Sequence, residues 1–216
     1  MPDPLFEAMA RSVMDGDPEQ AEALARKAVA EGVDPLQAIE LGFVIGVRRV
    51  GEAFGCGDAF LPDLVLAAEA MKAAFGVLDP ELAKRGKQRT TLGNVVVGTI
   101  KGDIHDIGKT LVATMLSASG FQVHDLGVDV PPEKFAEKAR EVDAIIVGVS
   151  ALLTTTMVNQ KSVIEALDDL GLRPKTKVMV GGAPVTRAFA DQIGADGYAE
   201  DAVGAVNEAK RLLGAG

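Results

Sequence analysis

Apolar residues recur at the three- and four-residue spacing of α-helices along residues 1–78. The pairs Asp17-Pro18 and Asp34-Pro35 are typical helix starts, because an aspartate caps free backbone amides and a proline suits the first turn. The third apolar stretch is hydrophobic on much of its surface, so it is expected to lie centrally or to face something besides its neighbours. The pattern predicts four helices, at about 4–15, 17–31, 35–54 and 62–77.

The pattern changes after a polar and basic stretch, 79–93, which we interpret as a linker. Beyond it, short apolar runs alternate with helical stretches, and this alternation predicts a parallel sheet with helices on both faces. Five strands suit the flavodoxin-like order 2-1-3-4-5, which has its switch point between strands 1 and 3. The predicted strands lie near 94–100, 121–126, 144–149, 177–181 and 196–199. The fold class is therefore α/β, with a four-helix bundle at 1–88 and a flavodoxin/Rossmann-like, five-stranded parallel sheet domain at 89–216.

Composition narrows the functional class. The 216 residues carry a net charge of −9, which argues against a nucleic-acid or anionic-membrane partner. The single cysteine, Cys56, excludes an intrachain disulfide framework and a cysteine-rich zinc site. The sequence shows no secretory signal pattern, and no apolar stretch reaches the roughly 18–20 residues of a membrane span. We therefore expect a cytoplasmic protein.

Candidate chemistry is concentrated in the loop that follows the first predicted strand. Asp103, His105 and Gly108 lie there, between a buried strand and a helix, where open α/β sheets bind ligands. The spacing Asp-x-His-x-x-Gly suits a metal-ligating imidazole steadied by a carboxylate. Nothing else nearby in the sequence completes a protein-only metal site. A single protein ligand implies that a prosthetic group supplies the remaining ones.

A nucleotide-binding loop is the competing interpretation. Gly102 and Gly108-Lys109-Thr110 nearly match the phosphate loop, but five residues separate the glycines where that motif has four. Carboxylates within the loop would also repel a triphosphate. The spacing and the charges both disfavour nucleotide hydrolysis.

The loop 102–108 resembles the lower-axial-ligand motif of the cobalamin-binding corrinoid proteins of methyltransferase systems, which act on methanol, methylamines or aryl methyl ethers. It is also similar to the cobalamin-binding module of methionine synthase. The resemblance implies base-off, His-on binding, in which the nucleotide tail of the cofactor leaves the cobalt and His105 replaces it. Asp103 would orient and polarise His105, and Thr156 would complete a hydroxyl–Asp–His relay.

Further motifs in the second half match the same family in order. The stretch 150–156 resembles the loop after strand 3, in which Ser150 and Thr154 would line the tail pocket. Gly181-Gly182 would lie beside the tail, and residues 198–202 would close its far end. The residues of this domain that the resemblance assigns to corrinoid binding are Gly102, Asp103, Ile104, His105, Asp106, Gly108, Ser150, Leu152, Thr154, Thr156, Gly181, Gly182, Tyr198 and Ala202.

The helical half resembles the family's cap over the upper corrin face. Phe54 and Leu61 would shield the methyl group and Glu40 would contact the corrin, although Phe54 and Leu61 taken alone are ordinary core residues. Cys56 departs from the family pattern; it is either a small residue of a glycine-rich turn or a thiolate for cobalt. Outside these motifs, we expect His124 to be a sheet or surface residue and Lys109 to be solvated at the start of a helix.

The resemblance implies a methyl carrier, a non-catalytic corrinoid subunit. It would accept a methyl group on Co(I) from a substrate-specific methyltransferase and deliver it to a second, methyl-acceptor methyltransferase, with a reductive activator as a further partner. After both domains are assigned, no residues remain for a methyltransferase barrel of about 200 residues or more. The alternatives are the small subunit of a cobalamin-dependent mutase and a cobalamin-sensing regulator.

Overall fold

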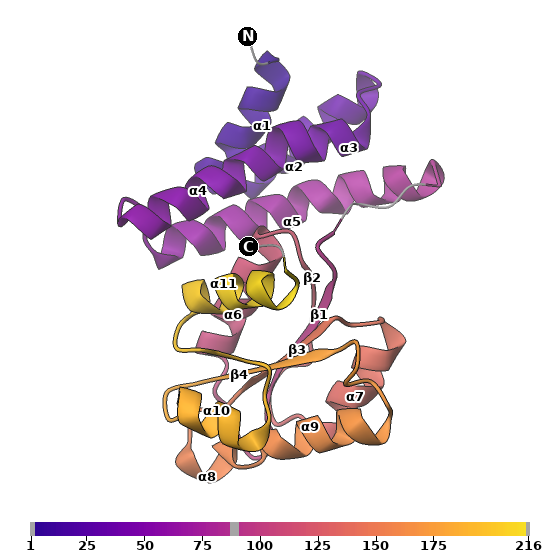
Figure 1. The fold of residues 1–216 in the computed structure, drawn as a ribbon. Helices are drawn as coiled ribbons and strands as arrows, with labels where there is room; N and C mark the ends of the chain where they lie inside the picture. Colours follow the sequence, from indigo (N-terminus) through magenta and orange to yellow (C-terminus); the bar gives the residue numbers. More distant parts are fainter. Residues whose placement is uncertain (1–2, 87–90, 215–216) are drawn as a thin grey trace. The chain divides into compact units, whose positions relative to one another are not determined.

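The structure is a computed structural model that describes residues 3–86 and 91–214 (Figure 1). Its contacts divide the chain into two compact units, Met1–Thr90 and Thr91–Gly216. None of the described helices is long and apolar enough to cross a membrane. The expected cytoplasmic location stays a prediction.

The first unit is helical, as predicted. Asp3, Asp17 and Asp34 each accept a hydrogen bond from a backbone amide in the first turn, next to a proline. Helix α2 packs along α5, and α1 packs against α4. The helices are α1 (Pro4–Met14), α2 (Pro18–Ala30), α3 (Pro35–Gln37), the π-helical segment η1 (Ala38–Phe43), α4 (Val44–Cys56) and α5 (Leu61–Lys84).

Two features of this unit differ from the sequence prediction. The helix expected over 35–54 contains the π-helical segment η1, and Gly42 and Gly46 near it allow close packing against α1. The prediction that a linker begins at residue 79 is wrong, because α5 continues through Pro80 to Lys84. Leu78 and Leu82 are almost fully buried, and their burial outweighs the backbone hydrogen bond that a proline removes. Residues 87–90 of the predicted linker lie outside the described part.

The second unit is a five-stranded, all-parallel sheet of order β2-β1-β3-β4-β5, which confirms the predicted fold class and strand order. The strands are β1 (Asn94–Thr99), β2 (Gln122–Asp125), β3 (Ile146–Ser150), β4 (Lys177–Gly181) and β5 (Gly197–Ala199). The helices are α6 (Ile107–Ala118), α7 (Pro132–Glu141), α8 (Thr154–Met157), α9 (Gln160–Asp169), α10 (Arg187–Ile193) and α11 (Ala202–Leu212).

The two faces of the sheet are covered differently. Helices α7, α9 and α10 lie on one side of it and α6 and α11 on the other (Figure 1). On the α7 side, a Cβ atom at Gly98 would come 2.7 Å from the ring of Phe135, so the glycine makes room for this buried aromatic. Side chains alternate along a strand, so Val97, Gly148 and Met179, which are in register, face α6 and α11.

Candidate functional site

His105 lies in the loop between β1 and α6, at the carboxyl edge of the sheet. Its Nδ1 is 2.7 Å from Oδ1 of Asp103, whose side chain is fully buried, whereas 48% of the His105 side chain is exposed. A carboxylate can only accept a hydrogen bond, so Nδ1 carries the proton. The lone pair of the neutral ring is therefore on Nε2, on the side of the imidazole that faces away from Asp103.

Asp103 is held as an anion by the loop around it. Its Oδ2 accepts hydrogen bonds from the Thr156 hydroxyl at 2.6 Å and from the amides of Leu152 and Leu153 at 2.8 and 3.2 Å. Burial raises the pKa of this carboxyl, but the hydrogen bonds from Thr156, His105 and Leu152 lower it more, so the pKa lies well below its usual range. The structure thus brings Thr156, Asp103 and His105 together in the order of the predicted relay.

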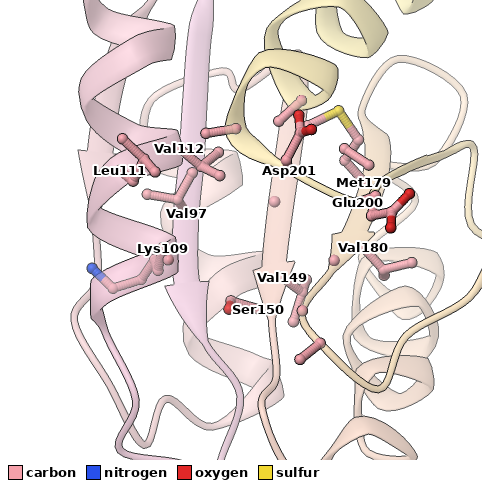
Figure 2. A pocket seen from close by; sticks show the side chains of 18 of the residues that line it. Val97, Lys109, Leu111, Val112, Val149, Ser150, Met179, Val180, Glu200 and Asp201 are labelled. Atoms are coloured by element: carbon pink, nitrogen blue, oxygen red, sulfur yellow. The ribbon is translucent and has the colours of Figure 1, made fainter. Parts of the chain in front are cut away.

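A cavity of about 310 Å³ opens beside this loop, between the sheet and helices α6 and α11. We call it the α6–α11 cavity (Figure 2). Of the residues assigned to cofactor binding, Gly108, Ser150, Leu152, Gly181, Gly182 and Ala202 line it. The wall is largely apolar, with Val97, Leu111, Val112, Met179 and Ala205 among its other members.

Other predicted residues lie elsewhere in the second unit. The Tyr198 side chain packs against the core on the α7 side, with the Arg187 guanidinium 5.3 Å from its ring centre. Its neighbours Ala199, Glu200 and Asp201 line the cavity instead. Four further residues of the prediction are exposed and do not line it: Gly102, Ile104, Asp106 and Thr154.

Comparison with known proteins shows which family the chain belongs to. Two family models described as "B12 binding domain" match residues 93–207 and 5–79. The trimethylamine corrinoid protein of Methanosarcina barkeri is 51% identical over 202 residues, which are 94% of this chain and 93% of that protein. The chain belongs to the B12-binding corrinoid proteins.

Two further similarities extend over nearly the whole corrinoid protein. The dimethylamine corrinoid protein of Methanosarcina barkeri is 49% identical over 209 residues, 97% of each chain. A chain in the crystal structure of the methanol:cobalamin methyltransferase complex MtaBC from the same organism superposes with a TM-score of 0.89 at 30% identity, covering 99% of this chain and 81% of that one. These relatives do not favour the mutase-subunit and regulator alternatives.

The cofactor of this corrinoid protein is cobalamin or a related corrinoid. Three observations show that the residues of the histidine loop (102–108) and the start of α6 fit such a group. The Nε2 lone pair of His105 is available to a metal. Large apolar side chains next to it are exposed, Ile104 by 74% and Ile107 by 83%, as suits the face of a large macrocycle. A Cβ atom at Gly108 would meet nothing within 4 Å, so the space over this glycine is open to a ligand.

The glycine pair 181–182 has a different explanation. Gly182 has a φ of +124°, and a Cβ atom there would lie 1.7 Å from the carbonyl oxygen of Ala151. A Cβ atom at Gly181 would lie 3.0 Å from the carbonyl oxygen of Ala199. The packing of the strand ends therefore already requires glycine at 182 and leaves little room for a side chain at 181, whereas Gly108 has no such requirement.

The prediction that Lys109 is solvated is wrong. Only 5% of the residue is exposed, and its ammonium forms an ion pair with Asp125 at the end of β2. In Figure 2 the nitrogen points away from the other labelled side chains. A buried cation needs such a partner, and the pairing leaves Lys109 unsuited to the phosphate-binding role of a nucleotide loop.

Gln160 was not anticipated. It is fully buried, and its amide nitrogen donates to the carbonyls of Val149 at 2.9 Å and Gly181 at 3.2 Å. It thereby joins the ends of β3 and β4 beside the cavity. His124 lies half-buried on β2 and is hydrogen-bonded to Asn94, as expected of a sheet residue.

The assigned residues of the helical unit have these positions. Glu40 is exposed within η1, and Phe54 is half-buried near the end of α4. Leu61 begins α5, and its side chain lies outside the described part. Cys56 is exposed and ends α4 before Gly57, whose φ is +82°. The contact of these residues with a corrin stays a prediction.

Proposed function

We propose that this corrinoid protein carries methyl groups in a methylamine methyltransferase system, with His105 as the lower axial ligand of its cofactor. The observation that carries the ligand assignment is the His105 imidazole, which a buried carboxylate holds through Nδ1, in the loop that leads to Gly108 at the α6–α11 cavity. Similarity over nearly the whole chain to trimethylamine and dimethylamine corrinoid proteins supports methylamines as the source of the methyl group.

Each residue of the histidine loop would have a separate role in binding the corrinoid. When bound, the corrinoid supplies a cobalt that takes up and gives away a methyl group; the protein sets its ligation and access. His105 provides the nitrogen ligand, and Asp103 fixes the tautomer and the ring plane, as partners of metal-bound histidines do. Thr156 and the amides of Leu152 and Leu153 keep Asp103 ionised and immobile.

The apolar surroundings would bind the rest of the group. The exposed side chains of Ile104 and Ile107 gain about 25 cal/mol for each Å² of apolar surface that a macrocycle removes from water. The α6–α11 cavity is the place for the nucleotide tail, since it adjoins the loop and is bordered by Gly108 and Ser150.

Methyl transfer would require partners, because the described residues form a helical unit and a five-stranded sheet unit, neither of which is a methyltransferase barrel. The partners that we propose are a methylamine-specific methyltransferase, a second methyltransferase that receives the methyl group, and a reductive activator of the cobalt. The MtaBC complex, a methanol:cobalamin methyltransferase, supports pairing with a methyltransferase of this kind. We place the system in the cytoplasm.

Removal of the imidazole tests the ligand assignment. The purified chain is reconstituted with cobalamin, and the visible spectrum is compared for wild type, His105→Ala and the matched control His124→Ala. We expect His105→Ala to lose the His-on spectrum while it retains part of the corrinoid through the cavity. His124→Ala should keep the spectrum, because this histidine lies on β2 and bonds to Asn94. An unchanged spectrum in His105→Ala excludes the assignment.

Reconstitution with methyltransferases tests the substrate class. The reduced, cobalamin-loaded chain is mixed with a trimethylamine, a dimethylamine or a methanol methyltransferase and the matching ¹³C-methyl substrate. We expect methylation with a methylamine methyltransferase and none with the methanol enzyme. Methylation by the methanol enzyme alone would refute the methylamine proposal and leave the methyl-carrier role intact.

A further inference from the structure

Asp129, in the segment between β2 and α7, supports the backbone of the histidine loop. Its carboxylate Oδ1 accepts a hydrogen bond from the Gly102 amide at 2.7 Å. Its own amide donates to the carbonyl of Asp103 at 2.9 Å. A single exposed residue thus makes two hydrogen bonds to a stretch that ends two positions before His105.

Asp129 makes these bonds from a left-handed backbone conformation, with a φ of +54°. Within the described part of the chain, Asp129 and Asp143 are the two non-glycine residues with positive φ. Glycine adopts this conformation freely, whereas an aspartate is strained in it. What the aspartate adds over a glycine at this position is its carboxylate, and the partner of that carboxylate is the histidine loop.

The remaining hydrogen bonds to the loop come from elsewhere in the unit. The Thr99 hydroxyl of β1 donates to the carbonyl of His105 at 2.8 Å. The Asp103 carboxylate is held from the end of β3 by Thr156 and its neighbours. Among the described residues, Asp129 makes the hydrogen bonds that hold residues 101–105 from the β2 side. Without its carboxylate, the Gly102 amide would lose its hydrogen bond, and only the amide of residue 129 would still hold residues 101–105 from this side.

We propose that Asp129 is a positioning residue for His105. By fixing the backbone at Gly102 and Asp103, it sets the direction in which Nε2 of the imidazole points. Strained residues that the surrounding structure holds in place are concentrated at functional sites, and this one adjoins the candidate ligand. The inference rests on the proposed axial role of His105, but its structural part concerns the cofactor-free chain and can be tested there.

The test compares the full-length variants Asp129→Gly and Asp129→Asn with the matched control Asp143→Gly. Asp129→Gly removes the acceptor and the strain together. Asp129→Asn keeps an acceptor oxygen and a residue that tolerates positive φ. Asp143→Gly removes the same kind of strain at a left-handed aspartate that lies just before β3 and pairs with Lys175.

Two measurements are made on each variant. In the cofactor-free chain, NMR follows the hydrogen exchange of the Gly102 amide and the ring-nitrogen shifts of His105. In the cobalamin-loaded chain, the visible spectrum gives the fraction of bound corrinoid with an axial histidine. For Asp129→Gly we expect roughly tenfold faster exchange, from the loss of a charge-assisted hydrogen bond, altered His105 shifts and a several-fold smaller His-on fraction. Asp143→Gly should match wild type, and Asp129→Asn, which keeps an acceptor without the charge, should lie between wild type and Asp129→Gly.

Urea unfolding of the same variants separates positioning from stability. Because relief of the strain offsets the lost hydrogen bond, Asp129→Gly should unfold at about the same urea concentration as wild type while its His-on fraction falls. Equal Gly102 exchange and His105 shifts in Asp129→Gly and Asp143→Gly would overturn the proposal. So would a His-on fraction that falls only in step with global stability. If wild type itself binds cobalamin without an axial histidine, the ligand assignment fails, and the cofactor-free NMR comparison still decides the role of Asp129.

Discussion

Replacing Thr156 by valine should destabilise the α/β unit by about 1.5–3 kcal/mol, the usual contribution of a hydrogen bond to a charged group. The change is nearly isosteric, and its effect follows from the surroundings of Asp103. This carboxylate is fully buried, so water cannot replace the lost donor. It accepts hydrogen bonds from five protein groups: the Thr156 hydroxyl, the His105 amide and ring nitrogen, and the amides of Leu152 and Leu153. The Thr156 bond is the shortest, at 2.6 Å.

The sequence provides an assay that is specific to this unit. The chain has no tryptophan and one tyrosine, Tyr198, which lies on β5 of the α/β unit. Tyrosine fluorescence during urea unfolding therefore follows the unit that contains Thr156. The free energy of unfolding is obtained for wild type, Thr156→Val and Thr156→Ser by linear extrapolation.

Thr156→Ser is the matched control. It keeps the hydroxyl and loses one methyl group, so it should cost about 0.8 kcal/mol or less. The ratio of the two effects matters more than either value. If Thr156→Val loses less than about 0.5 kcal/mol, or less than Thr156→Ser, the hydroxyl does not stabilise the buried carboxylate, and Thr156 is not part of a relay with Asp103 and His105.

Three further predictions follow from individual side chains. Removal of the Asp125 side chain should lower the free energy of unfolding by about 2–3 kcal/mol, because it leaves the buried Lys109 ammonium unpaired. Lys109→Met should lower it by less than about 1 kcal/mol, and equal urea midpoints for the two variants would contradict this prediction. The hydrogen bond from Arg211 holds the pKa of Glu208 below its usual value despite burial. Ionised Glu208 therefore stabilises the fold above about pH 4.3, and this contribution is lost as the pH falls through the lower folded-state pKa. The urea midpoint of Glu208→Gln should lie below that of wild type at pH 7 and approach it near pH 3. Gly108→Val should leave the cofactor-free chain folded, because a Cβ atom there meets nothing, but should lower cobalamin affinity at least tenfold in a spectroscopic titration.

The strands could be predicted from sequence because each is a short apolar run between turn residues. The parallel sheet followed from the alternation of strands with helices, and its order from the flavodoxin-like arrangement that five such strands suit. The end of α5 could not be predicted, since Pro80 has the local signature of a helix stop. What keeps the helix intact is the burial of Leu78 and Leu82, which depends on contacts distant in sequence.

The site was predictable where its residues are close in sequence and incomplete where they are not. The Asp103–His105 pair lies within one loop, and the family resemblance pointed to Thr156. The burial of Lys109 depends on Asp125, which is 16 residues away, and the support from Asp129 depends on a backbone dihedral angle. Neither appears in the local pattern of apolar and polar residues.

The π-helical segment Ala38–Phe43 has a consequence for the chain length of this helix. A π turn accommodates one residue more than an α turn, and each residue of an α-helix advances the chain by about 100° around the axis. Deletion of a single residue within this segment, such as Leu41, would therefore convert the π turn into an α turn and leave the later side chains close to their present directions. Val47 and Val50, now buried, would stay in the core. The same deletion within the regular helix α4 would instead turn every later side chain by about 100°, so the helical unit should tolerate the loss of one residue in this segment but not in α4.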